Sequence, residues 1–176
     1  MGICGLGHDV VDVAAFTEQL GEPGSHMRAL FSVRELRQAA SRARVKNDGE
    51  AVHLAAKWAG KEALLKAWCE ALGERPYPFT LDNFPWREVE ILDDSRGVPH
   101  VMLSGDAERA FRGTRGGGSP SVGSSADATV DPAVENNGDS VFQTDYAGSI
   151  PVIHISLSHD GPVASAVVIL ADECAD

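Results

Sequence analysis

A long amphipathic segment at residues 50–72 constrains the fold of this chain more than any other feature. Apolar side chains recur there at steps of three and four residues, at Ala51, Leu54, Ala55, Trp58, Leu65, Cys69 and Leu72. This spacing is typical of one apolar face of an α-helix. The segment therefore predicts a long helix whose apolar face packs against the rest of the protein.

One carboxylate interrupts this helix close to its apolar face. Glu62 falls between Trp58 and Leu65, roughly 45° from the middle of the face at about 100° per residue. Burying a carboxylate is costly unless a cation pairs with it. Lys66 lies one turn further on, and Lys57 and Lys61 flank another side. The pattern fits either a half-buried Glu62–Lys66 ion pair among solvated lysines or a site for a metal ion and phosphate.

Length and charge limit the class of protein. The chain has 176 residues, which suits a single domain, 1–176, with a real core. Its formal net charge of −11 argues against general binding to nucleic acid or to an anionic membrane, because phosphate groups attract clustered cations. We therefore expect neither nucleic acid nor a membrane among its partners.

The charge is uneven along the chain. Six basic residues lie between positions 28 and 46 against one acidic residue, Glu35; they are Arg28, Arg34, Arg37, Arg42, Arg44 and Lys46. Such a run is either the solvated face of a helix or a docking site for an acidic partner.

The cysteines and the N-terminus bear on location. Cys4, Cys69 and Cys174 are odd in number and lack metal-type spacing, so neither a disulfide framework nor a zinc site is expected. The sequence shows no charged leader followed by an apolar run, and no apolar stretch approaches about 18 residues. A reducing cytoplasm fits these features best.

The remaining pattern predicts an α+β fold. Residues 3–11 read as a buried strand in which Gly5, Gly7 and Asp9 share one face. The two glycines either clear space for whatever Asp9 faces or only permit close packing of the strand. Further helices are expected at 12–20, 32–40 and 104–112, with Ser32 and Glu35 in capping-box positions. Two hairpins, 86–92 with 98–103 and 150–157 with 163–170, predict a mostly antiparallel sheet packed on the long helix.

Residues 113–149 are expected to form an insertion. From 113 to 140 the composition shifts to glycine, serine and small polar residues, with no Leu, Ile or aromatic side chain. Such a segment cannot offset the entropy of ordering by burial. We therefore expect it to be flexible.

Three places carry residues suited to chemistry: Asp9, Glu62 with its lysines, and His159, which we expect in the turn at 158–162 of the last hairpin. Two carboxylates on rigid elements suit Mg²⁺, which binds one or two protein carboxylates together with substrate phosphates. Lysines would then contact phosphate oxygens as point charges. His159 is either a plain turn residue or an imidazole contact to a ligand.

Five motifs in register resemble the holo-acyl-carrier-protein synthases over nearly the whole chain. They lie at residues 5–13 (GLGHDVVDV), 28–35 (RALFSVRE), 58–68 (WAGKEALLKAW), 97–105 (GVPHVMLSG) and 155–160 (ISLSHD). The segment from about 113 to 149 is the one large misfit. The resemblance implies Mg²⁺-dependent transfer of phosphopantetheine from coenzyme A to a serine of an apo acyl carrier protein in fatty acid biosynthesis, with release of adenosine 3′,5′-bisphosphate. It also implies a homotrimer whose active sites lie between subunits.

The resemblance assigns roles to individual residues. Asp9 and Glu62 would hold Mg²⁺, and the pyrophosphate of coenzyme A would complete its coordination. Lys66 would be a phosphate contact and a candidate proton donor to the leaving group, which makes Asp9, Glu62 and Lys66 the catalytic set. Lys57, Lys61 and His159 are candidates for the remaining phosphates, with His159 contributed by an adjacent subunit.

One departure from the family and two alternative functions remain. Ala15 stands where many members carry an arginine that helps to dock the carrier, so docking here would depend on Arg28, Arg34 and their neighbours, and the carrier could belong to another pathway. The chain could instead be a non-catalytic module that binds coenzyme A or a carrier protein. A third reading is an Mg²⁺-dependent nucleotide pyrophosphatase.

Overall fold

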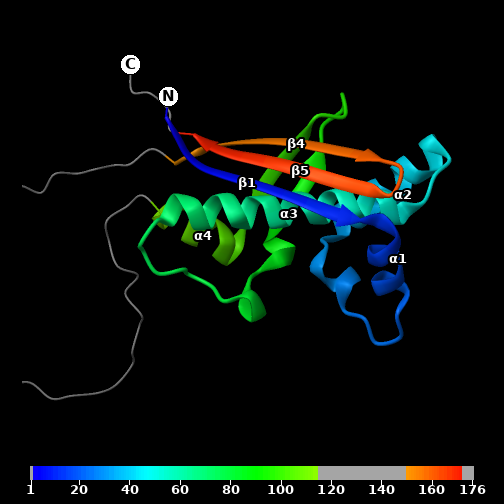
Figure 1. Cartoon of the computed structure of the whole chain (residues 1–176), viewed down its shortest axis with the longest axis horizontal. Coiled ribbons are helices and arrows are strands. Elements are labelled where there is room, and N and C mark those ends of the chain that lie inside the picture. The colour runs from blue at the N-terminus through cyan, green and yellow to red at the C-terminus, as the bar shows by residue number, and fades with distance from the viewer. Residues whose placement is uncertain (1, 115–149, 172–176) are drawn as a thin grey trace, which may run out of the picture.

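The long helix predicted from the sequence is the central element of the fold. In the computed structural model, which describes residues 2–114 and 150–171, it is α3 (Glu50–Leu72). A three-stranded antiparallel sheet lies along one side of α3 in the order β1 (Ile3–Asp12), β5 (Val163–Ala171) and β4 (Val152–Asp160) (Figure 1). A second antiparallel pair, β2 (Val89–Asp93) and β3 (Pro99–Leu103), also packs against it. The predicted α+β class with mostly antiparallel sheet is confirmed.

Shorter helices complete the described part of the chain. They are α1 (Val13–Gly21), α2 (Val33–Lys46), α4 (Gly105–Gly113) and the 3₁₀ turns Met27–Leu30, Leu81–Asn83 and Trp86–Glu88. At the start of α2, Ser32 and Glu35 form the predicted capping box, in which each side chain accepts a hydrogen bond from the backbone N–H of the other.

Two glycines let β1 lie directly on the backbone of α3. A Cβ atom on Gly5 would sit 2.2 Å from the carbonyl oxygen of Ala67, and one on Gly7 would sit 1.9 Å from that of Ala63. Both distances are far inside van der Waals contact, so no larger residue fits at either position. The glycines therefore serve close packing, and this packing brings Asp9, two residues beyond Gly7, up to α3.

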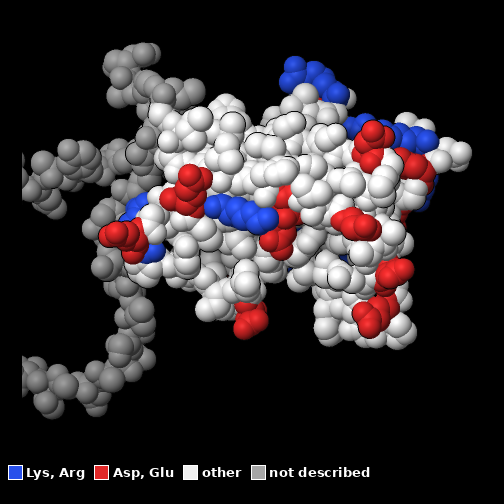
Figure 2. All heavy atoms as spheres, in the orientation of Figure 1, with Lys and Arg blue, Asp and Glu red and all other residues white. Residues whose placement is uncertain are grey.

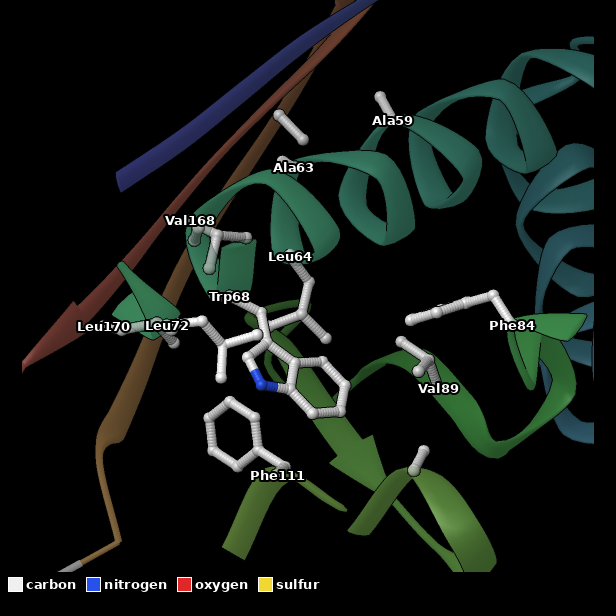
Figure 3. Packing of buried hydrophobic residues seen from close by; sticks show 13 residues of the cluster. Ala59, Ala63, Leu64, Trp68, Leu72, Phe84, Val89, Phe111, Val168 and Leu170 are labelled. Atoms are coloured by element: carbon white, nitrogen blue, oxygen red, sulfur yellow. The ribbon is translucent and has the colours of Figure 1, made fainter. Parts of the chain in front are cut away.

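Trp68 occupies the middle of the larger apolar core (Figure 3). Its ring is buried against Leu64 and Phe111, and its indole N–H donates a hydrogen bond of 2.8 Å to the hydroxyl of Thr114. Gly113 and Thr114, which we expected to begin the insertion at 113–149, thus belong to the end of α4. The rest of that segment, 115–149, lies outside the described residues.

The last hairpin differs from expectation in one way that matters for the site. β4 continues through Asp160, so only Gly161 and Pro162 form the turn, with Gly161 at φ +54°. A two-residue turn of this kind closes a hairpin and lets strand pairing run to its end. His159 accordingly lies within a strand, paired with Ala164; its predicted place in the turn is wrong.

The three-stranded sheet is covered by α3 on one face only (Figure 1). The other face carries exposed apolar side chains, including Leu6 and Val10 from β1 and Val163 and Val167 from β5. Soluble monomers rarely expose so many apolar residues together. Among the residues that the structure describes, no helix is long and apolar enough to cross a lipid bilayer.

Candidate active site

Asp9 and Lys66 form the centre of the site. Asp9 comes from β1, and its carboxylate accepts a hydrogen bond of 2.8 Å from the Nζ of Lys66 on α3. The same ammonium donates to the carbonyl oxygen of His8 at 3.1 Å. The Asp9 side chain is only 14% exposed, whereas that of Lys66 is 51% exposed. The pair therefore joins a half-buried carboxylate to a cation that can reach solvent.

Glu62 lies one turn before Lys66, close to the Asp9 carboxylate. Burial raises the pKa of Glu62 above its ordinary value, the charge of Asp9 raises it further, and the charge of Lys66 opposes both. Within the described chain, no ion pair or hydrogen bond joins Glu62 to a protein cation. The expected Glu62–Lys66 ion pair is thus replaced by one between Lys66 and Asp9. Two neighbouring carboxylates with one shared lysine leave an excess of negative charge that favours an added cation.

Lys61 occupies a different environment from the one predicted. Its side chain is fully buried, pairs with the equally buried Glu35 at 3.0 Å, and donates to the carbonyl oxygens of Trp86 and Val89. The other carboxylate oxygen of Glu35 accepts the backbone N–H of Ile91 at 2.9 Å. All three donors of the ammonium are therefore used inside the core, so the expected phosphate contact does not fit this residue.

Lys57 is also buried but faces a cavity. Its ammonium donates to the side-chain oxygen of Gln38 at 2.8 Å and to the carbonyl oxygen of Ile91 at 2.7 Å. Burial lowers its pKa, while the charges of Asp93 and Glu35 raise it. The cavity has a volume of about 180 Å³ and is lined by Arg42, Lys46, His53, Ala56, Lys57, Asp93, Gly97, Pro99, Leu157 and His159.

His159 reaches this cavity from β4, where Lys46 and His53 surround it. The Nζ of Lys46 lies 3.5 Å from its Nε2, and its ring meets that of His53 edge-on at 5.5 Å. Burial lowers the pKa of His159, and the charges of Lys46 and His53 lower it further. Asp48 binds His53 at 2.8 Å and raises the pKa of His159, as does Asp160. The cavity thus gathers cationic and neutral donors suited to an anion.

The predicted site residues therefore divide into two groups on different sides of α3. Asp9, Glu62 and Lys66 gather where β1 crosses the helix, whereas Lys57 and His159 face the cavity beside β4. At 3.6 residues per turn, the five residues from Lys57 to Glu62 correspond to a rotation of about 140°. One chain thus separates its carboxylate site from its cationic cavity by the body of the helix.

The basic run at residues 28–46, which begins in the 3₁₀ turn Met27–Leu30 and continues along α2, is partly neutralised. Three of its guanidinium groups form ion pairs with acidic residues of other elements: Arg28 with Glu50, Arg34 with Glu90 and Arg42 with Asp93. Arg37 and Arg44 are exposed. Basic and acidic side chains lie together at the end of the molecule where α2 lies, and the visible face carries acidic side chains on both sides of a basic one across its middle (Figure 2). A docking role for this run would rest mainly on Arg37 and Arg44.

The sequence analysis missed Arg42, Lys46 and His53 as cavity residues and Glu70 as a contact of β1. The backbone N–H of Leu6 donates a hydrogen bond of 2.6 Å to the Glu70 carboxylate. Their spacing held a signal, since Arg42 and Lys46, His53 and Lys57, and Lys66 and Glu70 are each four residues apart and share a helix face.

The donor set of the carboxylate site suits Mg²⁺. Asp9 and Glu62 offer hard oxygen ligands, and among the described residues no group of three or more His, Cys, Asp or Glu side chains is placed so that it could hold a metal ion by itself. Mg²⁺ commonly takes one or two protein carboxylates and completes its shell with water and substrate phosphates. The geometry thus defines a class of site for positioning and neutralising phosphate groups.

Comparisons with known proteins agree with this class. The family model described as the 4′-phosphopantetheinyl transferase superfamily matches residues 5–122 of the sequence. The chain is 51% identical to the holo-[acyl-carrier-protein] synthase of Bifidobacterium adolescentis, over 94% of this chain and 97% of that one. It is 46% identical to the synthase of the same name from Bifidobacterium animalis subsp. lactis, over 94% and 96%.

A solved structure agrees as well. The ACPS–CoA complex from Chronobacterium ammoniagenes superposes with a TM-score of 0.71 at 26% identity, and the match covers 99% of this chain and 100% of that one. The chain therefore belongs to the holo-[acyl-carrier-protein] synthase family of phosphopantetheinyl transferases, and it is an enzyme of that class. The resemblance inferred from the five motifs is confirmed.

Proposed function

We propose that this chain transfers the phosphopantetheine arm of coenzyme A to a serine of an apo acyl carrier protein, with Mg²⁺ held by Asp9 and Glu62. The observation that carries the proposal is the pair of half-buried carboxylates beside the accessible ammonium of Lys66. The names of the relatives support the transfer, and the related complex with CoA supports the donor.

In this reaction the serine oxygen attacks the phosphorus that carries the arm, and the bond from that phosphorus to the bridging oxygen of the nucleotide phosphate breaks. The serine proton passes to one of the carboxylates or to water. A bound Mg²⁺ would supply charge neutralisation on the pyrophosphate. Lys66 would leave Asp9, contact a phosphate oxygen and serve as a candidate proton donor to the leaving group. The ion pair with Asp9 holds this ammonium within reach of the site.

The cationic cavity supports a second phosphate contact. Coenzyme A carries a phosphate on its ribose in addition to the pyrophosphate, and Lys46, His159 and Arg42 line a cavity of about 180 Å³. Lys57 lies at the bottom of this cavity, with its ammonium held by Gln38 and Ile91. We therefore retain Lys57 and His159 as phosphate contacts and drop Lys61.

An apolar cavity supports binding of the arm. It has a volume of about 440 Å³ and is lined by Leu65, Trp68, Cys69, Leu72, Tyr77, Pro78, Phe79, Thr80, Leu81 and Phe84. Leu65 and Cys69 follow Glu62 by three and seven residues and so lie near it on α3, whereas Trp68 and Leu72 of the same lining point further round the helix. An arm leaving the pyrophosphate would meet apolar surface within one helical turn.

The same geometry supports our proposal of a homotrimer with shared sites. The helix body separates the carboxylate site from the cationic cavity within one chain, so one coenzyme A would bridge the two most directly across neighbouring copies. The exposed apolar face of β1 and β5 supplies a surface for such contacts. Light scattering should report three copies; an active monomer would contradict the shared site.

The decisive experiment incubates the protein with coenzyme A, Mg²⁺ and an apo carrier and then measures the mass of the carrier. A gain equal to the phosphopantetheine arm is expected, and Glu62→Gln should abolish it. Hydrolysis of coenzyme A without a carrier would favour the pyrophosphatase, and unchanged function in Glu62→Gln would favour a binding module.

Rates on fatty acid, polyketide and peptide-synthetase carriers would identify the pathway, for which fatty acid biosynthesis remains our proposal. The cytoplasmic location also remains a prediction.

A further inference from the structure

The edge strand β1 is tied to α3 by two side chains of the helix. The backbone N–H of Leu6 donates to Glu70 at 2.6 Å, and the carbonyl oxygen of His8 accepts from Lys66 at 3.1 Å. In the part of the chain that the structure describes, β1 pairs with β5 alone and so lies at the edge of the sheet. Backbone groups at an edge otherwise bind water or another chain. These two hydrogen bonds, which we call the tethers, therefore fix this strand to the helix.

These tethers matter because the contact between strand and helix is smooth. Gly5 and Gly7 lie against the backbone of α3 and have no side chains that could interlock with it. The ladder with β5 and the packing of Val11 hold β1 on α3, but the glycine contact adds no interlocking side chain. The polar contacts to Glu70 and Lys66 therefore add to this packing in fixing the position of Asp9 relative to Glu62.

The two tethers differ in whether their side chain also takes part in the proposed reaction. Lys66 also pairs with Asp9, and in the proposed reaction its ammonium turns to a phosphate oxygen. Glu70 lies eight residues after Glu62 on the same side of α3, and its partner Leu6 lies three residues before Asp9. When Lys66 leaves, the Glu70 contact is the remaining one of these two tethers.

We propose that Glu70 is a positioning residue, which holds β1 against α3 so that the carboxylates of Asp9 and Glu62 stay at a metal-binding separation when Lys66 turns to the substrate. The inference rests on the proposed function for the identity of the metal and the substrate. In this role Glu70 acts through the backbone of Leu6 and contacts neither metal nor phosphate itself.

The test compares Glu70→Ala, which removes the acceptor, with Glu70→Gln, which keeps an acceptor oxygen. Glu74→Ala is the matched control, because it removes the same charge at an exposed position one turn further on. Binding of Mn²⁺ in the presence of coenzyme A is measured by electron paramagnetic resonance, and exchange of the Leu6 amide hydrogen by NMR with Mg²⁺ and coenzyme A.

Glu70→Ala should bind Mn²⁺ roughly 10-fold more weakly. This is the lower end of the loss of metal affinity seen when a residue that positions a metal ligand is replaced. Glu70→Ala should also exchange the Leu6 amide faster and recover its kcat at saturating metal. Glu70→Gln and Glu74→Ala should resemble the wild type in all three measurements. Unchanged Mn²⁺ binding in Glu70→Ala would overturn the inference, and so would an equal loss in Glu70→Gln, since the hydrogen bond would then not be the cause. If the wild type modifies no carrier but the metal affinities follow this order, the proposed function fails and the role of Glu70 stands.

Discussion

Lys66 of α3 pairs with Asp9 of β1 at 2.8 Å, although Glu62 lies one turn away on its own helix. The pair links two residues that lie 57 positions apart in the sequence. Among the described residues, Lys66 is the only cation of the carboxylate site, and it pairs with a carboxylate that we expect to bind metal.

Replacing Lys66 by methionine should leave the fold intact and slow the transfer. The side chain is half exposed, so its packing contributes little, but it supplies the charge nearest the phosphates. Loss of one such group typically lowers kcat by roughly 100-fold or more. Lys66→Arg keeps the charge and should retain part of the rate. Carrier modification followed by mass spectrometry measures both variants, and an unimpaired Lys66→Met enzyme would remove Lys66 from the catalytic set.

Glu62 should make the metal-free protein less stable at neutral pH. Its pKa in the folded state is raised above the ordinary 4.5, so folding favours the protonated form. The contribution of this group to the free energy of unfolding is therefore present at low pH and is lost as pH rises through the raised pKa. Glu62→Gln should therefore have the higher free energy of unfolding at pH 7, and the difference should vanish below about pH 4.5. Urea titrations without metal at several pH values test this. A less stable Glu62→Gln at pH 7 would show that the carboxylate has a favourable partner.

The same shift predicts how pH affects metal binding. As pH falls through the raised pKa of Glu62, a proton occupies the carboxylate, and the affinity for Mg²⁺ should fall with it. Calorimetry in buffers of different ionisation enthalpy would report proton release on binding in this range. Glu62→Gln should release no such proton.

Lys61→Met should destabilise the protein strongly. It leaves Glu35 charged, buried and without its cation, a change that costs about 3–5 kcal/mol. The double variant Lys61→Met with Glu35→Gln should recover part of the loss. Guanidinium denaturation measures both. If Lys61→Met stays fully stable but fails to bind coenzyme A, the original expectation of a phosphate contact would be right after all.

Charge reversal at Arg37 and Arg44 should weaken carrier docking. Both side chains are exposed on α2, whereas Arg28 and Arg34 are held by acidic residues. The double variant should raise the KM for an acidic carrier and leave the KM for coenzyme A unchanged, more clearly at low salt. The double variant Arg96→Glu with Arg109→Glu, at exposed positions outside α2, provides a charge-matched control. Equal effects of the control and the variant at Arg37 and Arg44 would indicate a general charge effect.

Residues 116–140 should be removable with little change in stability or rate, because their composition offers little apolar surface for burial. A deletion that starts at 113 should behave differently. It removes the hydroxyl of Thr114 that binds the buried indole N–H of Trp68, and an unmade buried hydrogen bond costs about 1–3 kcal/mol. Thermal melts of the two deletions would separate these effects; equal melts would place the boundary of the insertion at 113.

Local patterns predicted most of the fold. The three-and-four spacing located α3 at its observed bounds, and the serine and glutamate spacing located the cap of α2. Those signals depend on neighbouring residues in the sequence, which the helix itself brings together. The hairpin at the C-terminal end was also predicted, but its turn was placed too early because the polar residues 158–160 read as a loop, whereas they continue β4.

The site was predicted only in part. Asp9, Glu62 and Lys66 could be grouped because the family resemblance linked segments that spacing alone cannot relate. The partners of the lysines could not be predicted, because they depend on which elements meet α3. Lys57 and Lys61 differ from Lys66 in that they point toward α2 and β2, where carbonyl groups and Glu35 receive them.

The strand order of the main sheet bears on when this enzyme becomes competent during synthesis. β5 follows the other described strands in the chain, lies between β1 and β4 and, among the described residues, is the only strand that pairs with β1. Asp9 lies opposite Ala166, a residue 157 positions further along the chain. Contacts so distant in sequence form late in folding. A nascent chain that lacks β5 should therefore be unable to load a carrier, however complete its helices are.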